Sequence, residues 1–146
     1  MNAKVFVDTN VLVYFRDASE ADKQQQAKKW LTYLWETGCG CLSYQVLQEF
    51  YYTVTQKLKP GMTCSSAQND VRALLAWRPV AVDYRVMESA WYLQERYSLG
   101  WWDALIVAAA QISGSRYLLT EDLQAEQSFG SVQIINPLQR SWESIA

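Results

Sequence analysis

Short apolar stretches alternate with longer amphipathic stretches along this chain, and that alternation limits the folds open to it. The short stretches are rich in β-branched and aromatic residues and are predicted strands at residues 4–7, 39–42, 80–82, 117–119 and 132–135. Between them, apolar residues recur at helical spacing. Strands separated by helices favour a parallel sheet covered on both faces, so we predict an α/β fold with about five short strands.

Polar residues and a glycine mark where several predicted helices begin and end. Ser43 and Asp83 each stand between a predicted strand and an amphipathic stretch, which is the position of an N-cap. The run Ser-Glu-Ala-Asp at 19–22 resembles a capping box, in which side chains bond to the free backbone N–H groups of a helix start. A helix is therefore expected to begin there and to end before Gly38.

The size of the chain fits one domain. Its 146 residues, 50% of them hydrophobic, can bury a substantial core, and we expect a single domain over residues 1–146. The 13 basic and 15 acidic residues argue against binding of nucleic acid through a broad basic face, but they leave room for a local site. Scattered cations could contribute to specificity at such a site, although each is more simply solvated surface; they include Lys23, Lys28, Lys57 and Arg85.

Location and chemistry follow from what the sequence lacks. No segment approaches the length of a membrane span, and no basic region followed by an apolar signal core opens the chain, so a cytoplasmic protein is predicted. Cys39, Cys41 and Cys64 form neither an even disulfide set nor a paired C-x-x-C metal pattern, and we expect reduced thiols. The chain has no histidine, so any hydrolytic chemistry must depend on carboxylates or a metal ion.

Four acids occupy unusual positions. Asp8 and Asp122 each follow a predicted strand, where open α/β sheets place their ligand sites. Asp103 and Glu49 lie within apolar helices, where an unpaired buried charge would cost several kcal/mol. Each acid alone also has an ordinary interpretation, because the three aspartates can be helix caps or first-turn acids and the glutamate can be solvated.

Taken together, the four acids predict a metal site. Two come from strand ends and two from helices that can line the same edge of the sheet. Two carboxylates about 4 Å apart repel by roughly 4 kcal/mol at an effective dielectric near 20, and a divalent cation or protonation must relieve that repulsion. An all-oxygen cluster suits Mg²⁺ or Mn²⁺, which can activate water for attack on a phosphodiester. Asn10 and Thr120 are predicted to orient ligands or water.

Four motifs along the chain resemble those of the PIN-domain ribonucleases. They are VDTN at 7–10, LQEF at 47–50, WDALIVAAA at 102–110 and LLTEDL at 118–123. Their order and spacing span nearly the whole chain, which is most similar to the VapC-type toxins of toxin–antitoxin pairs. The resemblance implies a Rossmann-like parallel sheet with an acidic pocket at its carboxyl edge that binds Mg²⁺ or Mn²⁺ and cleaves RNA.

The resemblance also assigns roles to single residues. The family's four acids, implied to bind the metal and carry catalysis, fall on Asp8, Glu49, Asp103 and Asp122. Its accessory hydroxyl falls on Thr120, and the polar residue of its first motif falls on Asn10. Many relatives carry another acid shortly after the fourth, whereas Leu123 and Gln124 stand here, so the number of metal ions stays open.

The resemblance further implies partners. Members of this toxin group form homodimers and are silenced by an antitoxin whose C-terminal segment enters the active-site groove. We therefore expect a homodimer, a VapB-like antitoxin and an RNA substrate, and no membrane partner. The seven tryptophans and nine tyrosines are compatible with this, because both residue types are enriched at interfaces, although they can equally fill a core.

Metal-dependent endoribonuclease activity is the leading hypothesis, and two alternatives stay open. Asp8 could be the covalent nucleophile of a phosphatase, although Asn10 stands where such enzymes carry a second acid. The chain could instead be a non-catalytic module that binds RNA or protein, although the presence of all four acids argues against a degenerate site.

Overall fold

The computed structural model describes residues 2–146 and contains a five-stranded sheet of order β2-β1-β3-β5-β4. The strands are β1 (Val5–Val7), β2 (Gly40–Cys41), β3 (Tyr117–Leu119), β4 (Ser128–Phe129) and β5 (Val132–Ile135). The first four strands of the order β2-β1-β3-β5 run parallel, and β4 pairs antiparallel with β5. The predicted α/β fold with a parallel sheet of about five strands is confirmed, except that the edge strand β4 is antiparallel.

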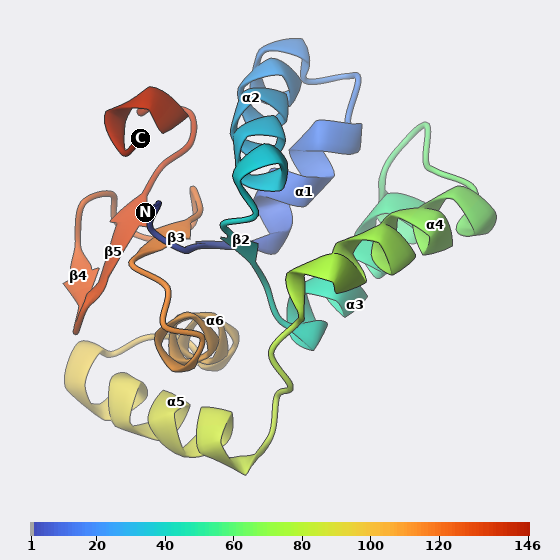
Figure 1. The fold of residues 1–146 in the computed structure, drawn as a ribbon. Coiled ribbons are helices and arrows are strands. Elements are labelled where there is room, and N and C mark those ends of the chain that lie inside the picture. The colour runs from blue at the N-terminus through green and yellow to red at the C-terminus, as the bar shows by residue number, and fades with distance from the viewer. Residues whose placement is uncertain (1) are drawn as a thin grey trace.

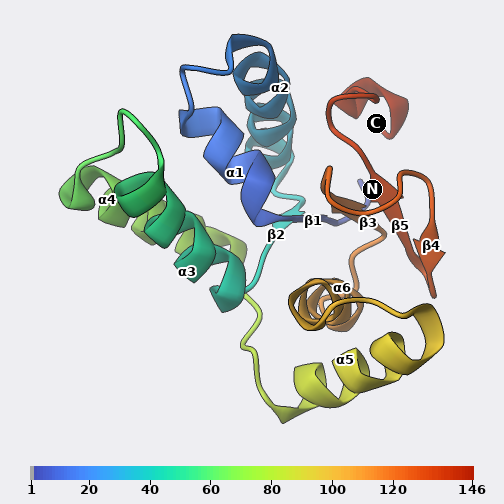
Figure 2. The same cartoon turned by 180° about the vertical axis from the view of Figure 1, so that it is seen from behind.

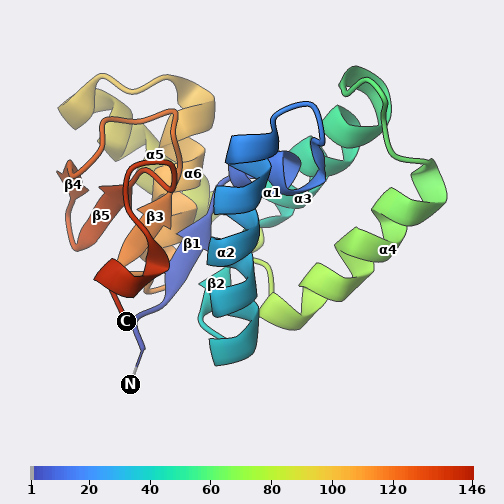
Figure 3. The same cartoon turned by 90° about the horizontal axis from the view of Figure 1, so that it is seen from above.

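Helices cover both faces of this sheet. The α-helices are α1 (Thr9–Arg16), α2 (Ala21–Thr37), α3 (Tyr44–Tyr52), α4 (Cys64–Leu74), α5 (Tyr84–Tyr97) and α6 (Trp101–Ile112). The short turns are a π-helical turn, η1 (Thr53–Lys57), and two 3-10 turns, η2 (Leu75–Trp77) and η3 (Trp142–Ser144). Helices α1 and α2 lie on one side of the sheet, and α5 and α6 lie on the other (Figure 1, Figure 2). Helices α3 and α4 extend beyond β2, at the end of the molecule opposite β4 (Figure 3).

Local side-chain chemistry sets several helix boundaries. Ser43 Oγ accepts the Val46 N–H at 3.3 Å, and Asp83 Oδ1 accepts the Arg85 N–H at 3.1 Å, so both predicted N-caps are confirmed. Gly38 ends α2 with a φ of 70°, a left-handed conformation that glycine adopts without a Cβ clash.

The predicted capping box at 19–22 is wrong. Glu20 is the N-cap of α2, and no side chain of the described residues caps this helix. The Ser19 hydroxyl instead donates to Asp17 Oδ1 at 2.5 Å, which closes the preceding turn. A local competing hydrogen bond therefore replaced the predicted cap.

One predicted strand is wrong, and one short strand was not predicted. Residues 80–82 form no strand, because Val80 makes only an isolated parallel bridge to Ser43 before the chain turns into α5 at Asp83. The fifth strand of the sheet is β4, whose two residues are too few for an alternating pattern.

The apolar core lies between the sheet and its helices. All three residues of β1 are fully buried, as expected for a strand covered on both faces. Helix α6 is buried from Ala104 to Ala110, in line with its uninterrupted apolar sequence. Trp30 is fully buried and donates its Nε1–H to the Arg140 carbonyl at 2.9 Å. Within residues 2–146, no helix has both the length and the apolar character needed to span a bilayer.

Candidate active site

The carboxyl ends of β1, β3 and β5 lie in register at one edge of the sheet. Val7 pairs with Leu119, and Leu119 pairs with Ile135. The residues that follow continue the hydrogen-bond ladder: the Asp8 N–H donates to the Leu119 carbonyl at 3.1 Å, and the Thr120 N–H donates to the Ile135 carbonyl at 3.0 Å. This register places Asp8 beside Thr120, although 112 positions separate them in the sequence.

Asp8 is held through both of its carboxylate oxygens. It is the N-cap of α1, and its Oδ1 accepts the Thr9 N–H at 2.7 Å. Its Oδ2 accepts the Thr120 hydroxyl proton at 2.9 Å. Only 6% of the residue is exposed. The Asp8 carboxylate therefore has a fixed orientation at the edge of the sheet.

The buried Thr120 hydroxyl also connects Asn10 to Asp122. Asn10 Nδ2 donates to Thr120 Oγ1 at 3.2 Å, and the Asp122 backbone N–H donates to the same oxygen at 3.1 Å. Asn10 Oδ1 is buried and has no hydrogen-bond partner within residues 2–146. An unpaired buried acceptor costs about 1–3 kcal/mol, which a water molecule or a cation beside it would offset.

Two helices carry the other two acids to this edge. Glu49 of α3 accepts the Thr9 hydroxyl proton through Oε1 at 2.8 Å. Gln45 lies one turn earlier and donates to the Trp102 carbonyl at 3.4 Å, which connects α3 to α6. Asp103 lies in the first turn of α6, where the helix dipole favours a negative charge.

All four acids line one open pocket of about 430 Å³. Asp8 is buried, Glu49 and Asp103 are half-buried, and Asp122 is exposed. The other polar and aromatic residues of the lining are Thr9, Asn10, Tyr14, Gln45, Tyr52, Thr53, Lys57 and Trp102. Thr120 does not line the pocket and acts on it only through its hydrogen bonds.

The pocket disfavours the ionised forms of two of its acids, Asp8 and Asp103. Burial is the largest cause that raises the pKa of Asp8 from 3.8 to about 7, and the charges of Asp122 and Glu49 add to the rise. Two hydrogen bonds to the Asp8 carboxylate, from Thr9 and Thr120, oppose this rise in its pKa. Burial, followed by the same two charges, also raises the pKa of Asp103. A pocket that penalises its own ionised carboxylates favours a bound cation.

The donor atoms of the pocket fit a hard divalent cation. Carboxylate and amide oxygens line it, and these are the ligands that Mg²⁺ and Mn²⁺ prefer. In the part of the chain that the structure describes, no three acidic or thiol side chains lie close enough together to hold one ion directly. Mg²⁺ tolerates such spacing because it binds through one or two carboxylates and keeps several of its water molecules. The pocket therefore suits a hydrated ion.

Comparison with known families agrees with this geometry. The family model of the PIN domain matches residues 5–127, and this span contains all four acids. This chain belongs to the PIN-domain family. The resemblance to PIN domains noted from the sequence motifs is thereby confirmed. A search among curated proteins found no sequence that matches this PIN domain.

Solved structures with a similar fold come from toxin–antitoxin systems. A toxin–antitoxin complex from Klebsiella pneumoniae has a TM-score of 0.64 at 17% identity, over 92% of this chain and 98% of that chain. VapC20 from Mycobacterium tuberculosis is described as a sarcin–ricin loop cleaving toxin. It has a TM-score of 0.59 at 20% identity, and the match covers 79% of this chain and 87% of that chain. VapBC2 from Rickettsia felis, bound to a DNA fragment from its promoter, has a TM-score of 0.59 at 15% identity, and the match covers 89% of this chain and 96% of that chain. At such identities, the comparison establishes a shared fold.

Thr9 and Lys57 are among the pocket residues that were not predicted from the sequence. Thr9 stands inside the first motif, but its hydrogen bond to Glu49 depends on how α1 meets α3. Lys57 was one of several cations with no predicted place and was interpreted most simply as solvated surface, whereas it lines the acidic pocket of this PIN domain. Its spacing of eight residues from Glu49 is close to two helical turns and is the one signal of its position.

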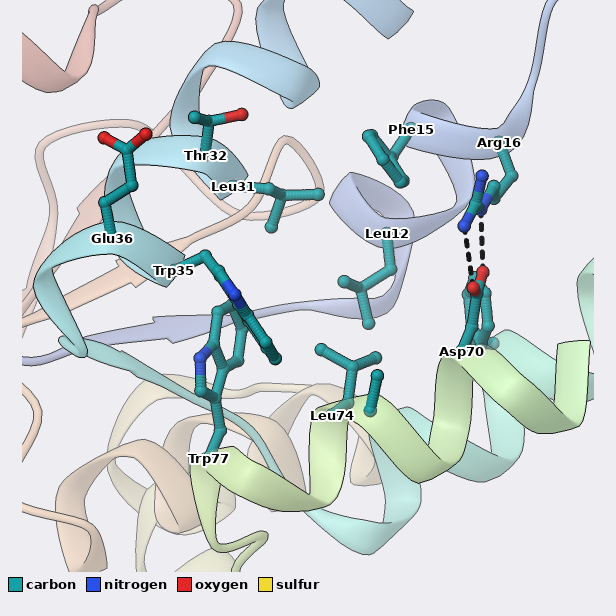
Figure 4. A pocket seen from close by; sticks show the side chains of 12 residues that line it. Leu12, Phe15, Arg16, Leu31, Thr32, Trp35, Glu36, Asp70, Leu74 and Trp77 are labelled. Atoms are coloured by element: carbon teal, nitrogen blue, oxygen red, sulfur yellow. Dashed lines mark hydrogen bonds and ion pairs between the residues drawn. The ribbon is translucent and has the colours of Figure 1, made fainter.

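A second pocket, of about 340 Å³, is apolar and lies against another face of α1 (Figure 4). Arg16 makes two hydrogen bonds of 2.7 Å to Asp70 at one side of it. Its apolar lining includes Leu12, Phe15, Leu31, Trp35, Leu74 and Trp77. None of the four acids lines it, so α1 separates an acidic pocket from an apolar one in this PIN domain.

Proposed function

We propose that this PIN domain is a metal-dependent endoribonuclease and the toxin of a VapBC-type toxin–antitoxin pair. The observation that carries the proposal is that Asp8, Glu49, Asp103 and Asp122 line one pocket at the carboxyl edge of the sheet. Carboxylates around such a pocket suit an ion that also recruits substrate phosphates. The similar folds of proteins from toxin–antitoxin complexes support the toxin assignment.

The protein's own residues prepare the reaction. The four acids would hold a hydrated Mg²⁺ or Mn²⁺, one or two of them directly and the others through its water molecules. The bound ion would polarise a phosphodiester and lower the pKa of a water molecule. Thr120 orients Asp8, and Thr9 orients Glu49, through their hydroxyl hydrogen bonds. A carboxylate of the cluster accepts a proton from the attacking water as its oxygen bonds to phosphorus. The P–O bond opposite that oxygen breaks, and the leaving oxygen keeps the electron pair and takes a proton from solvent water.

Asp103→Asn tests this proposal with little disturbance of the fold. Within residues 2–146 the Asp103 carboxylate accepts no hydrogen bond, so the amide loses no partner. Purified protein free of antitoxin is expected to cleave a pool of single-stranded and structured RNA in Mg²⁺ or Mn²⁺, and EDTA is expected to stop the cleavage. Asp103→Asn should lower the rate by about 100-fold or more. Glu95→Gln removes an exposed acid from α5 and is the matched control.

The outcomes separate the alternative functions. Cleavage that survives Asp103→Asn would contradict the proposed mechanism. If no condition gives cleavage, calorimetric titration with Mn²⁺ decides: binding that Asp8→Asn abolishes supports the metal site and points to a target absent from the pool. No Mn²⁺ binding would favour a non-catalytic binding module, and a phosphoaspartate on Asp8 would favour a phosphatase.

The same variant tests the toxin assignment in cells. Expression of the chain without an antitoxin is expected to arrest the growth of a bacterial host through cleavage of cytoplasmic RNA, and Asp103→Asn is expected to relieve the arrest. A VapB-like antitoxin is the expected partner, with a basic side chain that neutralises the acidic pocket. Normal growth on expression of the unchanged chain would contradict the toxin assignment.

A further inference from the structure

Lys57 is the single basic residue in the lining of the acidic pocket within the residues described. It is exposed and is the last residue of η1. Although four acids line the same pocket, no ion pair within residues 2–146 involves Lys57. Its ammonium lies 5.4 Å from the centroid of the Tyr52 ring instead. The positive charge therefore stays available to an anion that enters the pocket.

The backbone beneath Lys57 is firmly held. The turn η1 continues α3, and its Val54 side chain is fully buried. The Leu58 N–H donates to the Thr53 carbonyl at 2.9 Å, and the Met62 N–H donates to the Val54 carbonyl at 2.9 Å. π-Helical turns of this kind occur frequently at functional sites. Lys57 thus projects from an ordered turn beside the acids.

Lys23, which also lies near the acidic pocket, differs from Lys57 because it has a carboxylate partner. Lys23 pairs with Glu121 at 3.5 Å, and its ammonium lies 4.8 Å from the centroid of the Tyr14 ring. Tyr14 lines the acidic pocket, so Lys23 is close to it, but a carboxylate already balances its charge. Lys57 has the aromatic contact without the carboxylate.

We propose that Lys57 binds an RNA phosphate next to the scissile one, with Tyr52 positioning its ammonium. An RNA strand that approaches this pocket meets four carboxylates, which repel its phosphates. A cation at the edge of the pocket offsets that repulsion and fixes the register of the strand, because phosphate contacts position a nucleic acid without reading its sequence. This inference rests on the proposed ribonuclease function and adds a substrate-binding residue to it.

Lys57 could also have a purely structural role, which differs from phosphate binding in what it would change. Lys57 stands in the last turn of its helix, where a cation is favoured by the helix dipole. Such a role affects stability and leaves the salt dependence of RNA binding unchanged, whereas a phosphate contact contributes to that dependence through counterion release.

The test measures RNA binding in the Asp103→Asn protein, which is not expected to cut its ligand. Fluorescence anisotropy with a labelled single-stranded RNA of random sequence, between about 50 and 200 mM salt, gives the slope of log affinity against log salt. Lys57→Met is expected to weaken binding and to reduce the magnitude of this slope by about 0.7, the value for one phosphate contact on a single strand. Lys57→Arg should keep the slope, and Lys28→Met, which removes an exposed charge from α2, should leave it unchanged.

Steady-state cleavage supplies a second measurement in the chain with Asp103 intact. Lys57→Met is expected to raise KM and to retain kcat, because it removes a contact made equally in the ground and transition states. An unchanged slope and KM, or an equal effect of Lys28→Met, would overturn the role of Lys57 even if the protein cleaves RNA. A slope that depends on Lys57 in a protein that neither cleaves RNA nor binds Mn²⁺ would support the phosphate contact and overturn the proposed nuclease. Absence of any RNA binding would overturn both.

Discussion

The Asp8 side chain both caps a helix and faces the acidic pocket, and its burial has a thermodynamic consequence. The native carboxyl keeps its proton up to a pH of about 7, whereas its ordinary pKa is 3.8. Between these values the native state binds more protons than the unfolded state. The stability contribution of Asp8 is therefore complete at low pH and falls as the pH rises through this window.

In metal-free solution, the free energy of unfolding is expected to fall as the pH rises from about 4 to about 7, with up to about 1.4 kcal/mol per pH unit from Asp8. Asp8→Asn should flatten this dependence, because an amide does not ionise. Urea unfolding of both proteins in EDTA across the pH range measures the difference. Adding Mg²⁺ at neutral pH should stabilise the unchanged protein more than the variant. Parallel pH curves for the two proteins would contradict the argument.

At the scale of single residues, the sequence was sufficient to select the acids but not their contacts. Asp8 and Asp122 were selected because each follows a strand, and Asp103 because an acid is unusual in so apolar a helix. The structure places all three on one pocket. The hydrogen bond from Thr9 to Glu49 was not predictable, because it joins residues 40 positions apart through the packing of two helices.

At the scale of elements, β2 depends on a residue without a side chain. A Cβ on Gly40 would overlap the Trp77 ring. Trp77 is largely buried, and its ring lies 5.9 Å from that of Trp35, which limits the room for it to move. The Trp77 ring of η2 therefore occupies the space beside β2 that any larger residue at position 40 would need.

Gly40→Ala is expected to lower the free energy of unfolding by about 1–3 kcal/mol, the usual cost of overpacking. Trp77→Leu removes the ring, so the double variant should be less destabilised than the sum of the two single changes. Urea unfolding of the four proteins gives the coupling energy directly. Additive effects would show that the two residues do not compete for the same space.

Elements with a strong local signal were predicted correctly, and those set by packing were not. The predicted strands at 117–119 and 132–135 match β3 and β5 residue for residue. Residues 80–82 are equally apolar but make only one bridge, because the sheet provides no further pairing there. The π-helical turn η1 was not predicted, since the burial of Val54 and its contact with Met62 arise from tertiary packing.

At the scale of the whole molecule, large aromatic side chains remain exposed on α5 and at the start of α6. They are Tyr84, Trp91, Tyr92 and Trp102. Tyr84 packs edge to face on Trp91 with centroids 6.2 Å apart, and Trp91 stacks on Trp101 at 6.4 Å. The homodimer expected from the sequence resemblance is predicted to use this surface, because Tyr and Trp are the side chains enriched at protein interfaces.

The unchanged protein is expected to be a dimer in light-scattering measurements at micromolar concentration. Tyr92→Glu should shift it to the monomer, because the change places a charge in a desolvated contact. Leu75→Glu is the matched control, since Leu75 is an exposed apolar residue on η2, outside this surface. A monomeric unchanged protein, or equal dissociation of both variants, would exclude this dimer.

The sequence by itself determined the α/β class, the four parallel strands and the four acids, because these follow from local periodicity and from the residues at strand ends. Only the tertiary structure decided the strand order, the pairing of Asp8 with Thr120 and the place of Lys57 beside the acids. Those features depend on contacts between segments far apart in the chain. A local pattern records which face of an element is apolar, and it does not record which distant element covers that face.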